Sequence, residues 1–132
     1  MQKPNTKTTD QNQKTEFQKR VYIYTLNSLK FLSAVRTDKD AAARVILGQL
    51  IRSLSSIGAN IIEAKASNSK KDFARYFDIA LKSANETKYW LYLVRDLKLA
   101  DGVKIAKVID ETREISNILA ASLITMRKKR EI

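Results

Sequence analysis

The chain has 132 residues, in which 25 Lys and Arg outnumber 14 Asp and Glu and give a formal net charge of +11 at pH 7. This length suits a single domain, and 3 Gly and 1 Pro are too few for a turn-rich β architecture, so an all-α fold is predicted. With no Cys and no His, the sequence lacks the ligands of most zinc, haem and iron–sulfur sites, as well as the Ser–His and Cys–His nucleophile pairs. We therefore expect no cofactor and no enzymatic activity.

The N-terminal region is polar. Residues 1–15 are rich in Gln, Asn, Thr and Lys and have no apolar residue after Met1, which predicts a disordered arm. Residues 16–132 hold four segments with helical periodicity, predicted as helices over about 16–36, 40–66, 70–98 and 103–130. Thr37 or Asp38 is expected to cap the second helix.

The segment 40–66 has the most regular heptad pattern, formed by Ala43, Leu47, Leu50, Leu54, Ile57, Ile61 and Ala64. A short loop at 67–69 follows it, and Ser69 with Asp72 resembles a capping box. Similar stripes of regularly spaced, mainly apolar positions, which we call seams, run through 70–98 and 103–130. Thr87 occupies one position of the seam in 70–98. Because short loops make consecutive helices antiparallel, the sequence predicts an up-down-up-down four-helix bundle.

No run approaches the roughly 18 apolar residues of a membrane span, and the polar N-terminus lacks the apolar region of a signal peptide. We therefore expect a cytoplasmic protein with no membrane partner.

Carboxylates are the remaining candidates for chemistry. A di-iron carboxylate bundle requires Glu-x-x-His motifs, which a chain without His cannot form. Asp110, Glu111 and Glu114 are predicted to lie on a solvated face, balanced by Arg113 and Lys107.

A polar line crosses the otherwise apolar segment 40–66. Its members follow one another at steps of four, four and three: Arg52, Ser56, Asn60 and Glu63. Ser83 and Glu86 share a face of the next helix. We predict a polar network that fixes helix register or contacts a second subunit, in which Arg52 neutralises a carboxylate and Asn60 bonds to Ser83 or a backbone carbonyl.

Two questions about this stretch stay open. The polar line can face helix 70–98 of the same chain or another subunit. Small residues beside it flatten the helix surface for close approach, inside the bundle or at a subunit interface: Ser53, Ser56, Gly58 and Ala59.

Several aromatic residues lie beside Lys and Arg, namely Tyr22, Tyr76, Tyr89, Trp90 and Tyr92. Because residues 89–92 occupy consecutive positions around a helix, at least one of their rings must be exposed or covered by a partner. Burial against a protein partner is favoured over stacking on bases.

The positive charge is concentrated in the outer segments. Residues 1–36 carry seven basic and two acidic side chains, and residues 102–132 carry seven and four. This distribution favours a Lys/Arg surface that binds RNA or another nucleic acid, with these candidate residues: Lys19, Arg20, Arg127, Lys128, Lys129 and Arg130. The alternative partner is an acidic protein, for which the chain would serve as an interaction scaffold or accessory subunit.

Two blocks of sequence resemble a known family. QLIR at 49–52 and SIGANIIEA at 56–64 are similar to the core of the 23S rRNA-intervening sequence proteins, which are bacterial four-helix bundles. FARYFDIALKSANETKYWL at 73–91 is similar to the family's next block, in which Ala80, Ser83 and Glu86 match; the departures are Ile62, Ala64, Lys82 and Thr87.

The resemblance implies a homopentamer without known enzymatic activity that associates with RNA. Related proteins include the accessory variability determinant of diversity-generating retroelements, a basic pentamer that binds nucleic acid and a reverse transcriptase. The family supplies no agreed binding residues to transfer onto this chain.

Overall fold

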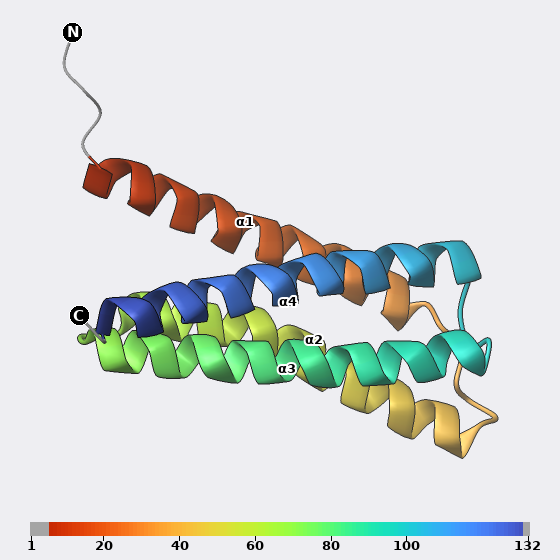
Figure 1. Cartoon of the computed structure of the whole chain (residues 1–132). Helices are drawn as coiled ribbons and strands as arrows, with labels where there is room; N and C mark the ends of the chain where they lie inside the picture. Colours follow the sequence, from red (N-terminus) through yellow and green to blue (C-terminus); the bar gives the residue numbers. More distant parts are fainter. Residues whose placement is uncertain (1–5, 131–132) are drawn as a thin grey trace, which may run out of the picture.

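The computed structural model describes the backbone of residues 6–130 and the side chains of residues 15–129. It contains four helices, α1 (Thr6–Ser33), α2 (Ala41–Ala66), α3 (Lys70–Asp96) and α4 (Gly102–Arg130), and this part of the chain forms no strand. The helices lie antiparallel in an up-down-up-down bundle, and α1 diverges from the other three toward its N-terminus (Figure 1). The predicted fold class is confirmed.

The first helix is longer than the sequence pattern predicts. It begins at Thr6 instead of near residue 16, so residues 6–15 of the expected arm are helical, whereas residues 1–5 lie outside the described chain. The physical reason is that nucleation is the costly step of helix formation. Once residues 17–33 are helical, the helix can extend through residues 6–15, which contain no Gly or Pro.

The helix ends show which residues cap them. Asp40 caps α2, since its carboxylate accepts a hydrogen bond from the Ala43 amide at 3.1 Å, so the predicted cap at Thr37 or Asp38 is wrong by two residues or more. The cap at Ser69 is confirmed by a 3.1 Å bond from the Asp72 amide to the Ser69 hydroxyl. Lys98 closes α3 with a φ of 55°, the left-handed conformation that usually terminates a helix.

The core consists of the seam residues of all four helices. The largest fully buried side chains belong mainly to α2, α3 and α4, among them Leu50, Leu54, Ile57, Leu91, Ile115 and Leu119. From α1, the buried side chains are Val21, Tyr24, Ser28 and Leu32. Within residues 15–33 of α1 the fully buried positions thus begin at Val21, and α1 diverges from the other helices toward its N-terminus (Figure 1).

Among the described helices, α2 alone is long and apolar enough to cross a membrane by length and composition. Its sequence nevertheless contains no unbroken run of about 18 apolar residues, because charged residues such as Arg44 and Arg52 interrupt it. The buried seam of α2 packs in the core of the bundle, and a core helix passes the same test of length and composition.

Candidate nucleic-acid interface

The predicted polar line faces α3 of the same chain. Arg52 forms an ion pair with Glu86, and the Ser56 and Ser83 hydroxyls lie 3.0 Å apart. Asn60 donates its amide to the Ser56 carbonyl at 2.8 Å and to the Ser56 hydroxyl at 3.0 Å. The bond from Asn60 to a backbone carbonyl is as expected, although the carbonyl belongs to α2 itself.

Glu63 does not belong to this network. Its side chain is exposed, and no hydrogen bond or ion pair joins it to another described residue. At 3.6 residues per turn Glu63 lies on the same face of α2 as Arg52 and Ser56, so its position around the helix does not explain the missing contact, and its exposed side chain faces solvent.

A buried pair completes the contact between α2 and α3. Thr87 and Ser53 are 0% and 1% exposed, and their hydroxyl oxygens lie 3.0 Å apart. The sequence pattern missed this pair because it treats Thr87 as a seam residue and Ser53 as a small residue. The sequence did indicate the pair in one respect, since both hydroxyl residues occupy positions that face the bundle interior.

The contact is graded from core to solvent. The Ser53–Thr87 pair is buried, the Ser56–Ser83 pair is half-buried, and the Arg52 and Glu86 side chains are 57% and 42% exposed. Polar pairs of this kind fix the register of two helices because a shift along the axis leaves buried hydroxyls without partners. The structure thus assigns these side chains to the α2–α3 contact.

Of the predicted nucleic-acid contacts, Arg20 is already neutralised within the chain. Its Nε donates to Glu111 Oε1 at 2.6 Å, and its Nη2 contacts Glu114. The hydrogen bond to Glu111, opposed by partial burial, raises the pKa of Arg20 above its ordinary value. Because two carboxylates face one guanidinium, Arg20 itself adds little positive charge to the surface of α1 and α4.

The predicted balance of the acidic residues 110, 111 and 114 by Arg113 and Lys107 is found only between Arg113 and Asp110 among the described residues. Arg113 lies 3.9 Å from Asp110 and hydrogen-bonds the Tyr92 hydroxyl, whereas Glu111 and Glu114 pair with Arg20. Lys107 forms no ion pair with a carboxylate within residues 15–129. The sequence could not reveal that α1 passes beside this acidic face.

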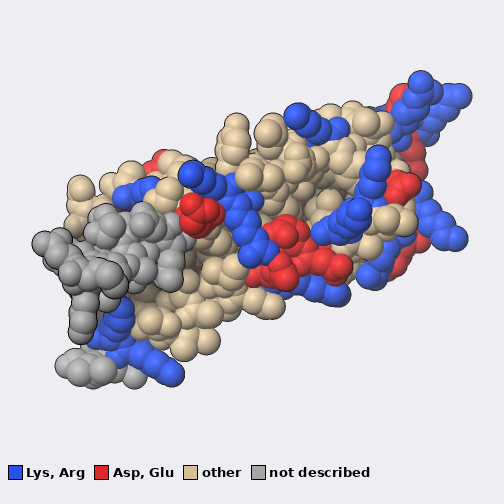
Figure 2. Space-filling model, turned by 90° about the horizontal axis from the view of Figure 1, so that it is seen from above, with Lys and Arg blue, Asp and Glu red and all other residues tan. Residues whose placement is uncertain are grey.

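Figure 2 shows how charges are distributed on one side of the molecule, where acidic side chains lie among basic ones. Lys19 is exposed on α1 beside Arg20, which pairs with Glu111 and Glu114. The predicted contact residues therefore form two groups, one on α1 beside these ion pairs and one at the C-terminus of α4, whose described side chains form no ion pair with another described residue.

That second group belongs to a larger cluster, which we call the basic end. It combines the C-terminus of α2, the N-terminus of α3 and the C-terminus of α4: Lys65, Lys70, Lys71, Arg127, Lys128 and Lys129. Lys65, Lys70 and Lys129 line one surface hollow of about 400 Å³. The side chain of Arg130 lies outside the described residues.

No carboxylate of the described side chains pairs with any residue of the basic end. Asp72, which is next to Lys71, lies 3.7 Å from the guanidinium of Arg75. Sequence reasoning found Arg127, Lys128 and Lys129 and missed Lys65, Lys70 and Lys71. The signal was the antiparallel topology itself, since it brings residues 65–71 to the end of the bundle where α4 finishes (Figure 1).

The aromatic residues are divided between exposed and occupied rings. Tyr22 and Tyr89 are 67% and 57% exposed, which confirms that one ring within residues 89–92 is exposed. Arg75 lies over the Tyr76 ring at 4.7 Å, and Arg95 over the Tyr92 ring at 5.0 Å. Rings already covered by the chain's own guanidinium groups are less available for stacking on bases.

Metal chemistry has no obvious site in this part of the chain. Among the described residues, no group of three or more His, Cys, Asp and Glu is arranged to hold a metal ion.

Comparison with known proteins gives a consistent assignment. Residues 14–121 match the sequence model described as 23S rRNA-intervening sequence protein. The fold is similar to the crystal structure of a protein of unknown function from the S23 ribosomal protein family of Bacteroides thetaiotaomicron, with a TM-score of 0.73 and 28% sequence identity. That similarity covers 81% of this chain and 97% of the other. No curated protein matches the chain.

Proposed function

The chain belongs to the 23S rRNA-intervening sequence protein family, and from that premise we propose that it is a non-enzymatic, cytoplasmic, homo-oligomeric protein that binds RNA through the basic end. The observation that supports this proposal most directly is the absence of carboxylate partners for the six cationic side chains there, within the described residues. Cations without carboxylate partners at one end of the bundle attract a polyanion without first breaking ion pairs.

The chemistry of the basic end suits phosphates better than base edges. Five of its residues are lysines at helix ends that are exposed to solvent. Lysine ammonium groups on flexible stems contact phosphate oxygens as point charges and carry little sequence information. RNA binding through this surface should therefore depend on the shape and backbone of the RNA and weaken with increasing salt.

An adjoining face, which shares Lys65 with the basic end, supports homo-oligomer formation. A hollow of about 590 Å³ between α1 and α2 is lined mainly by small and apolar residues and by no carboxylate. Beside or within it, Tyr22, Ile23 and Ile62 are 67%, 56% and 48% exposed. Exposed apolar surface of this kind is typical of protein interfaces, and we propose a homopentamer assembled through this face.

The RNA-binding proposal is tested by the salt dependence of affinity for a structured RNA. The double substitution Lys128→Gln and Lys129→Gln should weaken binding and lower the slope of log K against log salt by about 0.7 to 0.9 for each phosphate that is no longer neutralised. The double substitution Lys30→Gln and Lys39→Gln removes the same charge from exposed positions at the opposite end and is the matched control. Equal effects of the two pairs, or binding that is indifferent to salt, would contradict the proposal.

Oligomerisation is tested by light scattering on the purified protein. Ile62→Ser should lower the subunit number, whereas Val103→Ser, which replaces another exposed apolar residue, should leave it unchanged. A monomer in the unsubstituted protein would refute the assembly.

A scaffold for an acidic protein partner is the second candidate function, favoured by the exposed ring of Tyr89 on α3. Capture of the same acidic protein from lysate before and after nuclease treatment would support it, provided that Tyr89→Ser abolishes the capture.

A further inference from the structure

An apolar pocket opens beside the basic end. It has a volume of about 530 Å³ and receives side chains from all four helices, including Phe17 from α1, Ile61 from α2, Phe73 and Phe77 from α3, and Met126 from α4. Phe17 and Gln18, which line it, belong to α1, the helix that diverges from the other three toward its N-terminus (Figure 1). Its volume is in the range of about 300 to 1,000 Å³ that is usual for ligand sites.

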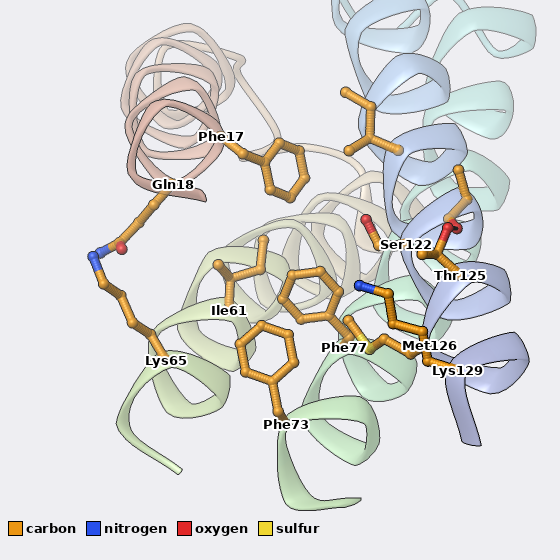
Figure 3. A pocket seen from close by; sticks show the side chains of 12 residues that line it. Phe17, Gln18, Ile61, Lys65, Phe73, Phe77, Ser122, Thr125, Met126 and Lys129 are labelled. Atoms are coloured by element: carbon orange, nitrogen blue, oxygen red, sulfur yellow. Dashed lines mark hydrogen bonds between the residues drawn. The ribbon is translucent and has the colours of Figure 1, made fainter. Parts of the chain in front are cut away.

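Aromatic rings form much of the pocket wall. Figure 3 shows the rings of Phe17, Phe73 and Phe77 converging from two different helices on one space. Phe73 and Phe77 are stacked, with ring centroids 4.7 Å apart and an interplanar angle of 27°. An entering flat ring would therefore meet the faces and edges of phenyl groups, which is the environment that favours stacking.

Cationic groups stand at the boundary of the pocket. Lys65 and Lys129 line it, and the same two residues line the neighbouring hollow together with Lys70. The side chain of Lys129 extends toward the space between the rings and α4 (Figure 3). The apolar pocket and the basic end are therefore continuous, and Lys65 and Lys129 belong to both.

We propose that this pocket receives one unpaired base of a bound RNA, while Lys65, Lys70 and Lys129 contact the phosphates on either side of it. This inference rests on the RNA-binding function proposed above. Insertion requires an unpaired nucleotide, because a base that remains in a duplex is stacked and paired with its neighbours. The hydroxyls of Ser122 and Thr125 on the α4 wall provide polar groups for the edge of the base.

An apolar carboxylate is the competing occupant, since a hydrocarbon chain can fill an apolar pocket with a lysine at its mouth. Two observations favour the base. Three phenyl rings line the pocket, and its cations continue into a neighbouring hollow that carries a further lysine, Lys70, which does not line the pocket itself. A nucleotide chain has both a ring and a series of phosphates to match them.

The test compares two RNA hairpins of equal length and charge, one with a fully paired stem and one with a single bulged 2-aminopurine. We expect the bulged hairpin to bind about tenfold more tightly, which corresponds to about 1.4 kcal/mol, because one base stacks on aromatic side chains. The fluorescence of the 2-aminopurine should change on binding.

Two variants address the pocket. Phe73→Leu removes a half-buried ring from the wall, and Ala121→Trp fills the space from an exposed position on α4 without removing any core atom. Each should reduce the preference for the bulged hairpin to about twofold or less and leave affinity for the paired hairpin unchanged. The control is Tyr89→Leu, which removes an exposed ring from α3, the helix of Phe73, at a position outside the pocket.

The outcomes separate the two proposals. Failure to bind either hairpin at low salt would refute the RNA-binding function and the inference with it. Equal, salt-sensitive binding of both hairpins that neither pocket variant alters would overturn the base pocket and leave the RNA-binding function standing. Binding of decanoate that both variants weaken, together with no preference for the bulge, would assign the pocket to an apolar anion and also overturn the inference.

Discussion

The buried hydroxyl pair of Ser53 and Thr87 between α2 and α3 leads to a prediction about the free energy of unfolding. Ser53→Ala and Thr87→Val each remove one hydroxyl from a site that is 1% or 0% exposed. Each single substitution leaves a buried hydroxyl without its cross-helix partner, so each should lower the free energy of unfolding by about 1–2 kcal/mol. The double variant removes both groups and should lose less than the sum of the single losses, by about 1 kcal/mol.

Ser53 and Thr87 also form hydrogen bonds within their own helices, and these bonds explain the lower end of the expected loss of about 1–2 kcal/mol. Ser53 also bonds the Leu50 carbonyl at 3.2 Å, and Thr87 bonds the Ser83 carbonyl at 2.7 Å, both within their own helices. These local bonds partly satisfy whichever hydroxyl remains. For a chain of this length, 1 kcal/mol corresponds to a shift in Tm of about 3–6 °C.

Urea unfolding followed by circular dichroism at fixed protein concentration measures this coupling, since assembly would otherwise shift the apparent stability. Ser55→Ala is the matched control, because the Ser55 hydroxyl bonds only carbonyls of its own helix. Its effect should add to that of Thr87→Val. If Ser53→Ala and Thr87→Val are also additive to within about 0.3 kcal/mol, the two hydroxyls do not interact and the proposed register contact is refuted.

Three further predictions concern two glycines, a tyrosine and two lysines. A Cβ added at Gly58 would lie 3.5 Å from Val21 Cγ1, an ordinary contact, and one at Gly48 would meet nothing within 4 Å, so both Gly→Ala substitutions should stabilise the protomer by about 0.5–1 kcal/mol in thermal unfolding. If Gly58→Ala alone lowers the subunit number in light scattering, the α1–α2 face packs against another copy. Burial raises the pKa of Tyr24 above its ordinary value of 10.0, so its contribution to stability is complete below pH 10 and declines as the pH rises further, and Tyr24→Phe should flatten the decline measured by urea unfolding between pH 9 and 11. An equal decline in Tyr24→Phe would show that other groups cause it. Lys70→Gln with Lys71→Gln should raise the free energy of unfolding slightly, by about 0.5 kcal/mol, and weaken RNA binding; a loss of stability with unchanged RNA binding would contradict the proposed role of the basic end.

The fold could be predicted from the sequence because one physical signal dominates it. The heptad seam of α2 places Leu50, Leu54 and Ile57 in the core, and all three are fully buried. Residues 6–15 could not be assigned in the same way, because a polar segment carries no periodic signal and becomes helical as an extension of a helix that packs elsewhere. Asp40 was likewise missed as a cap, since Asp38 and Asp40 offer the same carboxylate two residues apart.

The site was less predictable because it depends on contacts between distant segments. Arg20 is a basic residue in a basic segment, and only the path of α1 beside α4 brings Glu111 and Glu114 to it. The reverse holds for Lys65, which looks isolated in the sequence but shares a hollow with Lys129. Charge counted along the chain thus overestimates the cationic character of α1 and underestimates that of the basic end.

The helix ends indicate which cations of the basic end folding itself requires. Lys65, Arg127 and Lys128 lie in the last turns of α2 and α4, where the partial negative charge of the helix C-terminus favours a cation by about 0.3–1 kcal/mol. Lys70 and Lys71 lie in the first turn of α3, where the helix dipole opposes a positive charge and only Asp72 offsets it. Folding therefore accounts for the cations on α2 and α4 but not for those on α3. An anionic ligand bound across the end of the bundle accounts for both sets, which makes Lys70 and Lys71 the residues whose charge most specifically argues for a polyanion at the basic end.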